Sequence, residues 1–189
     1  MKAQLKSYLN RYINFSDNEI DEIYASLNVV TFANKEFILS EGQICMNNYF
    51  IMSGLTRSFY IDAKGNEKIT QFAIENWWTT NMESFITASP STSNIQALEK
   101  TTVLIISKTE LEKLYKSLPK LERFFRIITE KMLIAIQRRS DVYLQMKSKD
   151  RYTDLINHFP GFAQRVPQYM IASYLEITPE YLSELRKSL

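Results

Sequence analysis

The residue types that support most enzyme chemistry are scarce in this chain. Its 189 residues include one histidine, His158, and one cysteine, Cys45. A mononuclear metal site in a β-barrel enzyme needs several histidines, usually with a carboxylate, and an iron–sulfur cluster needs several thiolates. The four glycines are scattered, so there is no phosphate loop or dinucleotide fingerprint, and no spacing of Ser, His and Asp indicates a catalytic triad. We therefore expect no enzyme activity, no metal site and no cofactor.

The C-terminal segment has a pattern that does indicate a function. From Gln168 onward it fits the helix-turn-helix motif of DNA-binding proteins. Ala172 falls where the two helices cross and a large side chain would clash. Thr178 can cap the second helix, and Pro179 suits its first turn. The apolar residues expected between the two helices are Ile171, Leu175, Ile177, Leu182 and Leu185.

The second helix of such a motif enters the major groove of DNA, with its N-terminal residues at the base edges. A glutamate there can accept a hydrogen bond from cytosine N4. We expect the first outward residues to face bases, and Arg186 and Lys187 to contact phosphates. The predicted DNA-contacting residues are Thr178, Pro179, Glu180, Ser183, Glu184, Arg186 and Lys187.

Two features of this segment oppose DNA binding. Glu176 stands at the turn position that glycine usually fills, so its β-carbon must be accommodated in a left-handed conformation at ~1–2 kcal/mol. Glu176, Glu180 and Glu184 are also spaced four apart, which places three carboxylates toward a polyanion. Residues 147–189 hold six Lys and Arg against five Asp and Glu, a net charge of +1.

A long helix is expected to position this motif. Residues 121–146 contain no Gly or Pro, and their apolar residues recur at alternating steps of four and three, which is a heptad seam. We expect two copies to pair in parallel through this seam; the alternative is the core helix of a monomer. Arg139 fills the remaining position and can extend its charge to solvent. The seam residues are Leu121, Phe125, Ile128, Met132, Ala135, Val142 and Met146.

Upstream of the long helix, residues 29–106 read as short β-strands. Six β-rich runs are separated by turns that contain Gly42, Gly54 and Gly65, and many short strands with frequent turns indicate a jelly roll, sandwich or barrel. Helices are expected on both sides of this region, over residues 4–27, with a capping box at Ser16–Glu19, and again after Ser107. The predicted fold class is therefore α+β, with a β jelly roll first and an all-helical end.

The composition does not indicate a particular kind of partner. The net charge is +2, hydrophobic residues make up 45%, and no apolar run reaches membrane-spanning length. The N-terminus is too polar for a signal peptide, and a lone cysteine fits a reducing compartment. We expect a cytoplasmic protein with no membrane association.

The order of parts resembles the Crp/Fnr family of bacterial transcription regulators. The stretch NNYFIMSGLTRSFYIDAKGNEKITQF is similar to the cyclic-nucleotide-binding type of jelly roll, and QRVPQYMIASYLEITPEYLSELRK to the family's helix-turn-helix. The resemblance implies an effector domain at residues 1–118, a dimerisation helix at 119–146 and a DNA-binding domain at 147–189. It also implies double-stranded DNA and a second copy of the chain as partners, together with a small-molecule effector.

The resemblance fails at the ligand site. Members that bind cyclic AMP hold the ribose with a Gly-Glu pair and the phosphate with an Arg, but Thr80-Asn81 and Ser91-Thr92 stand near those positions here. No Lys or Arg occurs at residues 69–99, and a buried phosphate without a cation is costly to desolvate. The effector should therefore be a molecule other than cyclic AMP. Candidate pocket residues are Trp78, Thr80, Asn81, Met82, Ser91 and Thr92.

Two functions stay open on the sequence alone. One is a dimeric DNA-binding regulator, favoured by the intact apolar pattern of the helix-turn-helix. The other is a signalling or scaffold module that keeps the roll and the dimer helix but no longer binds DNA. The acidic residues favour the second, as does the end of the sequence at Leu189 without the β-hairpin wing that family members often add.

The first testable prediction concerns cyclic nucleotides. Neither cyclic AMP nor cyclic GMP should bind with micromolar affinity, because residues 69–99 offer no cation to either phosphate. Isothermal titration calorimetry measures this directly. Micromolar affinity for either nucleotide would contradict the prediction and would indicate that a cation from elsewhere, such as Arg57, reaches the phosphate.

Overall fold

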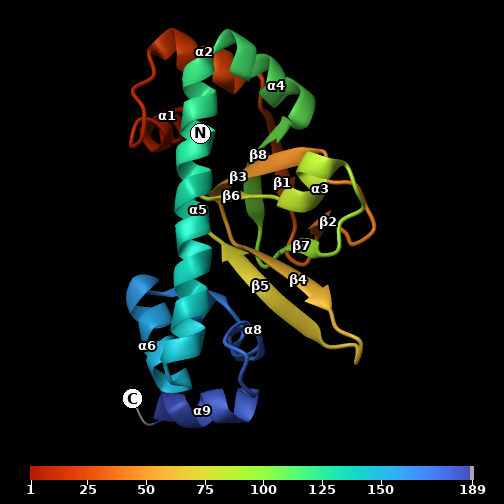
Figure 1. Cartoon of the computed structure of the whole chain (residues 1–189), viewed down its shortest axis with the longest axis vertical. Helices are drawn as coiled ribbons and strands as arrows, with labels where there is room; N and C mark the ends of the chain where they lie inside the picture. The colour runs from red at the N-terminus through yellow and green to blue at the C-terminus, as the bar shows by residue number, and fades with distance from the viewer. Residues whose placement is uncertain (188–189) are drawn as a thin grey trace. The chain divides into compact units, whose positions relative to one another are not determined.

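The computed structural model describes residues 1–187. The chain divides into two compact units, the first made of Met1–Tyr60 and Gln71–Thr129 and the second of Ile61–Thr70 and Glu130–Leu189. Two elements contribute to both units, the long helix α5 and the hairpin formed by strands β4 and β5 (Figure 1).

The first unit is built on a sandwich of two four-stranded sheets. One sheet has the strand order β1-β8-β3-β6 and the other the order β2-β7-β4-β5. The strands are β1 (Asn28–Phe32), β2 (Phe37–Leu39), β3 (Asn47–Ser53), β4 (Thr56–Ile61), β5 (Glu67–Ala73), β6 (Trp78–Thr79), β7 (Asn94–Ala97) and β8 (Thr101–Ser107). The predicted fold class, a roll of many short strands followed by helices, is confirmed.

The prediction of one helix over residues 4–27 is wrong, because this segment forms two helices. The chain forms α1 (Lys2–Leu9) and α2 (Asp17–Ala25), with an irregular stretch between them. In that stretch the Asn10 side chain accepts a hydrogen bond from the backbone N–H of Phe15 at 3.0 Å. The break lets both Leu9 and Phe15 reach the core, where they are 0% and 2% exposed. The predicted capping box of Ser16 and Glu19 is confirmed as the start of α2.

Three short elements carry no clear signal in the sequence: β6, β7 and the helix α3 (Met82–Thr87). Strand β7 has two polar residues that are nevertheless buried, because their side chains bond to the backbone on either side of β2. Gln96 donates from Nε2 to the Lys35 carbonyl at 2.8 Å, and the oxygen of Asn94 accepts from the Glu41 N–H at 2.9 Å. These hydrogen bonds satisfy the two polar side chains of β7, while Ile95 and Ala97 alternate with them and are buried as well.

The first turns of α5 (Pro119–Gln145) are part of the core of the first unit. Leu121 is 1% exposed and Phe124 is 0% exposed. The Phe124 ring meets the edges of Tyr8, Tyr12 and Phe15 at centroid distances of 5.9, 5.7 and 6.5 Å. Helix α4 (Lys108–Ser117) begins after Ser107, as expected, and the Ser107 side chain caps it; Leu111 and Leu114 are buried in the same core.

The second unit consists of short helices together with the later turns of α5 and the tip of the β4–β5 hairpin. The helices are α6 (Ser148–His158), α7 (Phe162–Arg165), α8 (Gln168–Tyr174) and α9 (Pro179–Lys187). Their buried residues include Tyr152, Phe162 and Val166, which form a small apolar centre. Within residues 1–187, no helix is both long and apolar enough to cross a membrane.

A glycine of the roll gives the second testable prediction. Gly54 has φ +103°, and an added β-carbon would meet the Thr101 Oγ1 at 2.4 Å and its Cα at 2.7 Å. Gly54→Ala should therefore lower the free energy of unfolding by about 2–4 kcal/mol, measured by urea denaturation.

Gly65→Ala is the matched control, because Gly65 has φ +83° but nothing within 4 Å of an added β-carbon. It should lose only the ~1–2 kcal/mol of the left-handed backbone. Equal losses in the two variants would show that the close approach to Thr101 has no energetic effect.

Candidate functional site

Helices α8 and α9 form the helix-turn-helix predicted from the sequence. Ala172 is 0% exposed at the helix crossing, and the apolar residues of both helices are buried or half-buried. The turn residue Glu176 has φ +56°, which confirms the left-handed conformation expected there. The N–H of Ile177 donates to the Ala172 carbonyl at 3.0 Å and closes the turn. The two helices therefore meet through a turn that glycine would occupy at lower energy.

The start of α9 is capped as expected. The Thr178 hydroxyl accepts a hydrogen bond from the Tyr181 N–H at 3.2 Å, and Pro179 is the first helical residue. Thr178, Pro179 and Glu180 are exposed. Capping leaves the other backbone N–H groups of the first turn open, and a positive helix end attracts phosphate.

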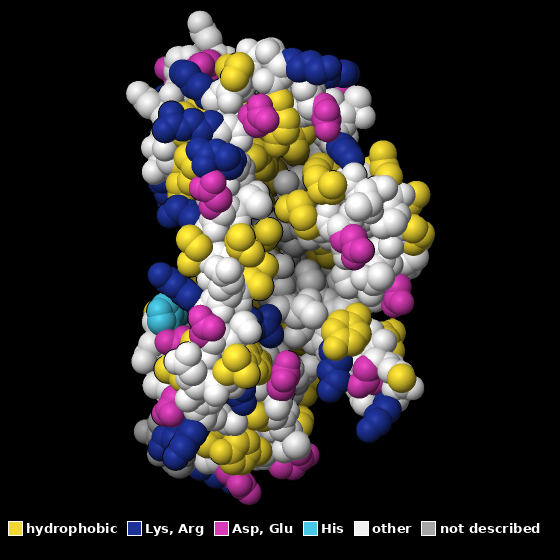
Figure 2. Space-filling model, viewed as in Figure 1, with side chains coloured by type: hydrophobic (Ala, Val, Ile, Leu, Met, Phe, Trp, Pro, Cys, Tyr) yellow, Lys and Arg dark blue, Asp and Glu magenta, His cyan; other side chains and the backbone are white. Residues whose placement is uncertain are grey.

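One face of α9 carries most of the predicted DNA-contacting residues. Glu180, Glu184 and Lys187 are exposed and Ser183 is half-buried, and their spacing of three and four residues places them on the same side. The carboxylates make this face acidic at its centre and basic only at its end. Figure 2 shows, on the face drawn, Lys and Arg interspersed with Asp and Glu over the part formed by the C-terminal helices, with no continuous basic patch.

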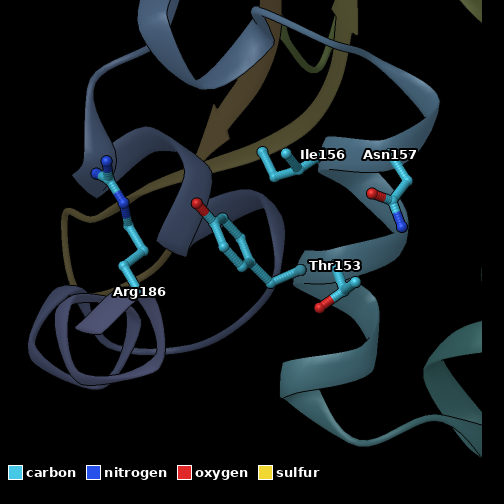
Figure 3. Close-up of a pocket in the computed structure, with 5 residues that line it drawn as sticks. Thr153, Ile156, Asn157 and Arg186 are labelled. Atoms are coloured by element: carbon cyan, nitrogen blue, oxygen red, sulfur yellow. The ribbon is translucent and has the colours of Figure 1, made fainter. Parts of the chain in front are cut away.

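Arg186 lies on a different side of α9. It is two residues beyond Glu184, about 200° around the helix. A groove of about 310 Å³ separates it from α6 and is lined by Tyr152, Thr153, Ile156, Asn157 and Arg186. In Figure 3 Arg186 faces the labelled α6 side chains across this groove. A phosphate contact by Arg186 stays a prediction. In this structure the Arg186 side chain lines a groove whose other residues belong to α6.

Two exposed tyrosines extend the candidate surface beyond the residues expected from the sequence. Tyr181 follows Glu180 on α9 and is 42% exposed, and Tyr169 in the first turn of α8 is 54% exposed. Tyrosine hydroxyls donate to DNA phosphates in many complexes. The exposure of these two tyrosines could not be predicted from the sequence, because both have apolar residues at helical spacing, such as Leu185 for Tyr181 and Ala172 for Tyr169.

The polar residues predicted for an effector pocket form hydrogen bonds within the roll. The Thr80 hydroxyl donates to the Asn47 carbonyl at 2.9 Å and lies 3.2 Å from the Cys45 sulfur. Asn81 caps α3 by accepting from the Ser84 N–H, and Ser91, which is 2% exposed, donates to the Ser93 carbonyl at 2.7 Å. These polar groups hold the turns around α3 in place.

Trp78, Met82 and Thr92 complete the predicted set, and the structure does not gather them into one site. The Trp78 ring packs on Phe50 and Phe125 at centroid distances of 5.1 and 5.0 Å, as a core residue does. Met82 is 38% exposed and Thr92 is exposed.

Arg57 is the buried cation nearest in sequence to this region, and it is engaged elsewhere. Its guanidinium donates to the Gln96 side-chain oxygen at 2.8 and 3.0 Å and lies 4.0 Å from the centre of the Phe59 ring. Among residues 1–187, no group of three or more His, Cys, Asp or Glu side chains is placed to hold a metal ion.

Two threonine hydroxyls of the roll are buried without a partner among the described residues. Thr56 and Thr79 are 0% and 3% exposed, and their hydroxyls have no hydrogen-bond partner within the described part of the protein. The indole N–H of Trp78 is in the same condition. Buried polar groups are normally paired, so three orphans in one small domain call for an explanation.

Comparisons with known proteins place this geometry in context. Residues 29–117 match the family model of the cyclic nucleotide-binding domain. No curated protein sequence matches the chain.

Several solved structures share its fold. One is the c-di-GMP-responsive global regulator CLP of Xanthomonas campestris, with 14% identity, a TM-score of 0.74, and coverage of 92% of this chain and 91% of that one. FixK2 from Bradyrhizobium japonicum has 18% identity and a TM-score of 0.71 over 86% and 84% of the two chains. The catabolite activator protein of Thermus thermophilus has 16% identity and a TM-score of 0.62 over 96% and 86%. Residues 29–117 are thus similar to the cyclic nucleotide-binding domains, and the chain has the fold of the Crp/Fnr-family transcription regulators.

Proposed function

We propose that this protein is a DNA-binding transcription regulator of the Crp/Fnr type. It acts as a homodimer, and its roll senses an effector other than cyclic AMP. The observation that carries the proposal is the helix-turn-helix itself, in which α9 is capped by Thr178, presents an exposed first turn and follows a left-handed turn residue. The similar solved structures with regulator names support the same function and give no support to an enzyme.

In this proposal α9 enters the major groove of DNA. Thr178, Glu180, Ser183 and Glu184 face the bases, and the glutamates accept hydrogen bonds from cytosine N4. Lys187 contacts a phosphate. A two-fold symmetric dimer presents two such helices, so the target is near-palindromic with half-sites about one turn, ~34 Å, apart.

The apolar surface of α5 supports a second copy as the partner. Part of the predicted seam already packs within the chain, because Leu121 is buried and Phe125 and Ile128 lie against the core of the first unit. Met132, Ala135 and Met146 of the seam are exposed. A further exposed stripe recurs at steps of three and four and consists of Leu133, Ile136, Ser140 and Leu144, in which Leu144 is 83% exposed. We propose that the partner copy covers this stripe together with the exposed seam residues.

The effector in this proposal carries no phosphate that the roll must neutralise. CLP is named as c-di-GMP-responsive, but residues 69–99 of this chain contain no cation for a cyclic dinucleotide either.

One observation favours the alternative, a scaffold that no longer binds DNA. Glu176, Glu180 and Glu184 are all exposed, so each stands ready to repel a duplex. The two functions differ in a measurable way, since only the regulator binds duplex DNA in a salt-dependent manner.

The third testable prediction concerns the dimer. Leu133→Glu with Ile136→Glu should convert a dimer into a monomer in sedimentation velocity, because two charges would be buried at the contact. Ile134→Glu with Gln145→Glu is the control: both residues are exposed and helical spacing places them away from the stripe and from the exposed seam residues, so the dimer should persist. A wild-type chain that sediments as a monomer would refute the dimer.

The fourth prediction tests DNA binding by fluorescence anisotropy at two salt concentrations. Glu184→Arg should tighten binding to arbitrary duplex DNA roughly tenfold at low salt, because it replaces a repelled carboxylate by a cation. Lys187→Ala should weaken binding to all sequences and lower the salt slope by about one.

The matched control is Glu112→Arg, which makes the same change of charge at an exposed position of α4 in the first unit. It should alter the affinity far less than Glu184→Arg. If wild type shows no salt-dependent binding and Glu184→Arg changes nothing, the scaffold function takes the place of the regulator.

A further inference from the structure

The tip of the β4–β5 hairpin belongs to the second unit, although its two strands run on from the sandwich of the first. The Asp62 carboxylate organises this tip by accepting from the backbone N–H groups of Lys64 and Asn66, each at 2.9 Å. The bond from the Asn66 N–H is the main reason that the pKa of the Asp62 carboxyl is lowered. The tip is therefore a built turn with a defined shape.

Helix α8 is fastened to this hairpin by one side chain. The Ser173 hydroxyl donates to the Glu67 carbonyl at 2.9 Å and accepts from the Ile69 N–H at 3.2 Å. Ile69 is only 4% exposed, so water competes poorly for this contact. Ser173 thus binds β5 through a backbone donor and a backbone acceptor at once.

Arg139 of α5 makes the second connection. Its guanidinium donates to the carbonyls of Thr70 and Tyr174, the latter at 3.3 Å, and stacks 4.1 Å from the centre of the Tyr174 ring. The Tyr143 hydroxyl donates to the same Tyr174 carbonyl, and burial raises the pKa of that phenol, which keeps its proton in place. A planar guanidinium suits this role, because it can donate in two directions and stack at the same time. The expectation that Arg139 extends to solvent is wrong.

Tyr174 is the last residue of α8, and the turn that leads into α9 begins at the next residue. Carbonyl groups at a helix end lack partners within the helix, and a cation there is favoured by the helix dipole. The carbonyl held by Arg139 is therefore the one that fixes the end of α8 and the direction in which the turn leaves it.

We propose that Arg139 and Ser173 form a latch that ties the β4–β5 hairpin to the helix-turn-helix turn, so that a displacement of the hairpin is passed to α8. The hairpin supplies backbone groups at Glu67, Ile69 and Thr70, and α8 supplies Ser173 and the Tyr174 carbonyl. Arg139 is a positioning residue that acts through Tyr174. The latch does not depend on DNA binding and operates equally in the scaffold alternative.

Amide hydrogen exchange of the full chain, followed by mass spectrometry, tests the latch without DNA. Asp62→Ala loosens the hairpin turn but has no bond to α8. It should raise the exchange rate in the tip, and through the latch also in residues 168–178, by about fivefold, the factor that one net hydrogen bond provides. In the background Arg139→Met with Ser173→Ala, the same substitution should affect the tip alone.

Arg138→Met with Asp141→Ala is the control background, because both residues are exposed, lie close to Arg139 on α5 and belong to neither the stripe nor the seam. There Asp62→Ala should act as in the wild type. The latch is refuted if Asp62→Ala leaves residues 168–178 unchanged in the wild type, or if it affects them equally in the latch-free background.

A variant could also exchange rapidly throughout because the second unit has unfolded, which circular dichroism detects. In that case the milder substitutions Asp62→Asn and Arg139→Lys are used. Lysine keeps the positive charge but lacks the planar guanidinium that donates in two directions, so the effect of the Asp62 substitution on exchange in residues 168–178 should still be smaller. Full transmission with Lys would refute the role of the guanidinium. Since every readout is free of DNA, failure of the latch and failure of DNA binding are seen in separate experiments.

Discussion

The burial of Phe124 at the start of α5 is the interaction on which the rest of the structure depends. Its ring is fully enclosed by Tyr8, Tyr12 and Phe15, so the first turns of the helix have one permitted rotation. The helix then continues unbroken as far as Gln145. The face turned to the core at Phe124 therefore influences which later residues of α5 are exposed to solvent and which, like Arg139, bind within the chain.

How far the sequence predicts this structure depends on the range of the interactions. The capping box at Ser16, the cap at Thr178 and the left-handed Glu176 each follow from residues a few positions apart, and all three are confirmed. The apolar stripe of α5 was also visible, but a heptad pattern does not say what covers it. Leu121 is covered by the core of its own unit, a fact that depends on contacts far along the chain.

The candidate sites show the same division. The outward residues of α9 could be predicted because a short amphipathic helix has one buried face, set by Leu182 and Leu185. The roles of Arg139 and Ser173 could not, since their partners at Thr70 and Glu67 lie 69 and 106 residues away. The short strand β7 was not predicted for a related reason: its polar side chains bond to residues far away along the chain, Gln96 to Lys35 and Asn94 to Glu41.

Each of the two units has a region in which Lys and Arg are scarce. The segment around α3 has no Lys or Arg, and the exposed face of α9 has a single lysine beside two glutamates. Both places correspond to phosphate-binding surfaces in the family that this fold resembles. Neither place offers the positive charge that attracts phosphate groups without regard to sequence, so a ligand or duplex bound there would have to be held by hydrogen-bond geometry.

Strand β5 lies at the edge of its sheet, which gives the bond from Ser173 an additional meaning. An uncovered edge exposes unpaired N–H and C=O groups, which can pair with a strand of another molecule and start aggregation. The Ser173 hydroxyl pairs with the Glu67 carbonyl and the Ile69 N–H, as the backbone of a neighbouring strand would. Separation of α8 from the hairpin would expose both groups to pairing with a strand of another molecule. The contact that holds the first helix of the helix-turn-helix thus also protects the protein against aggregation.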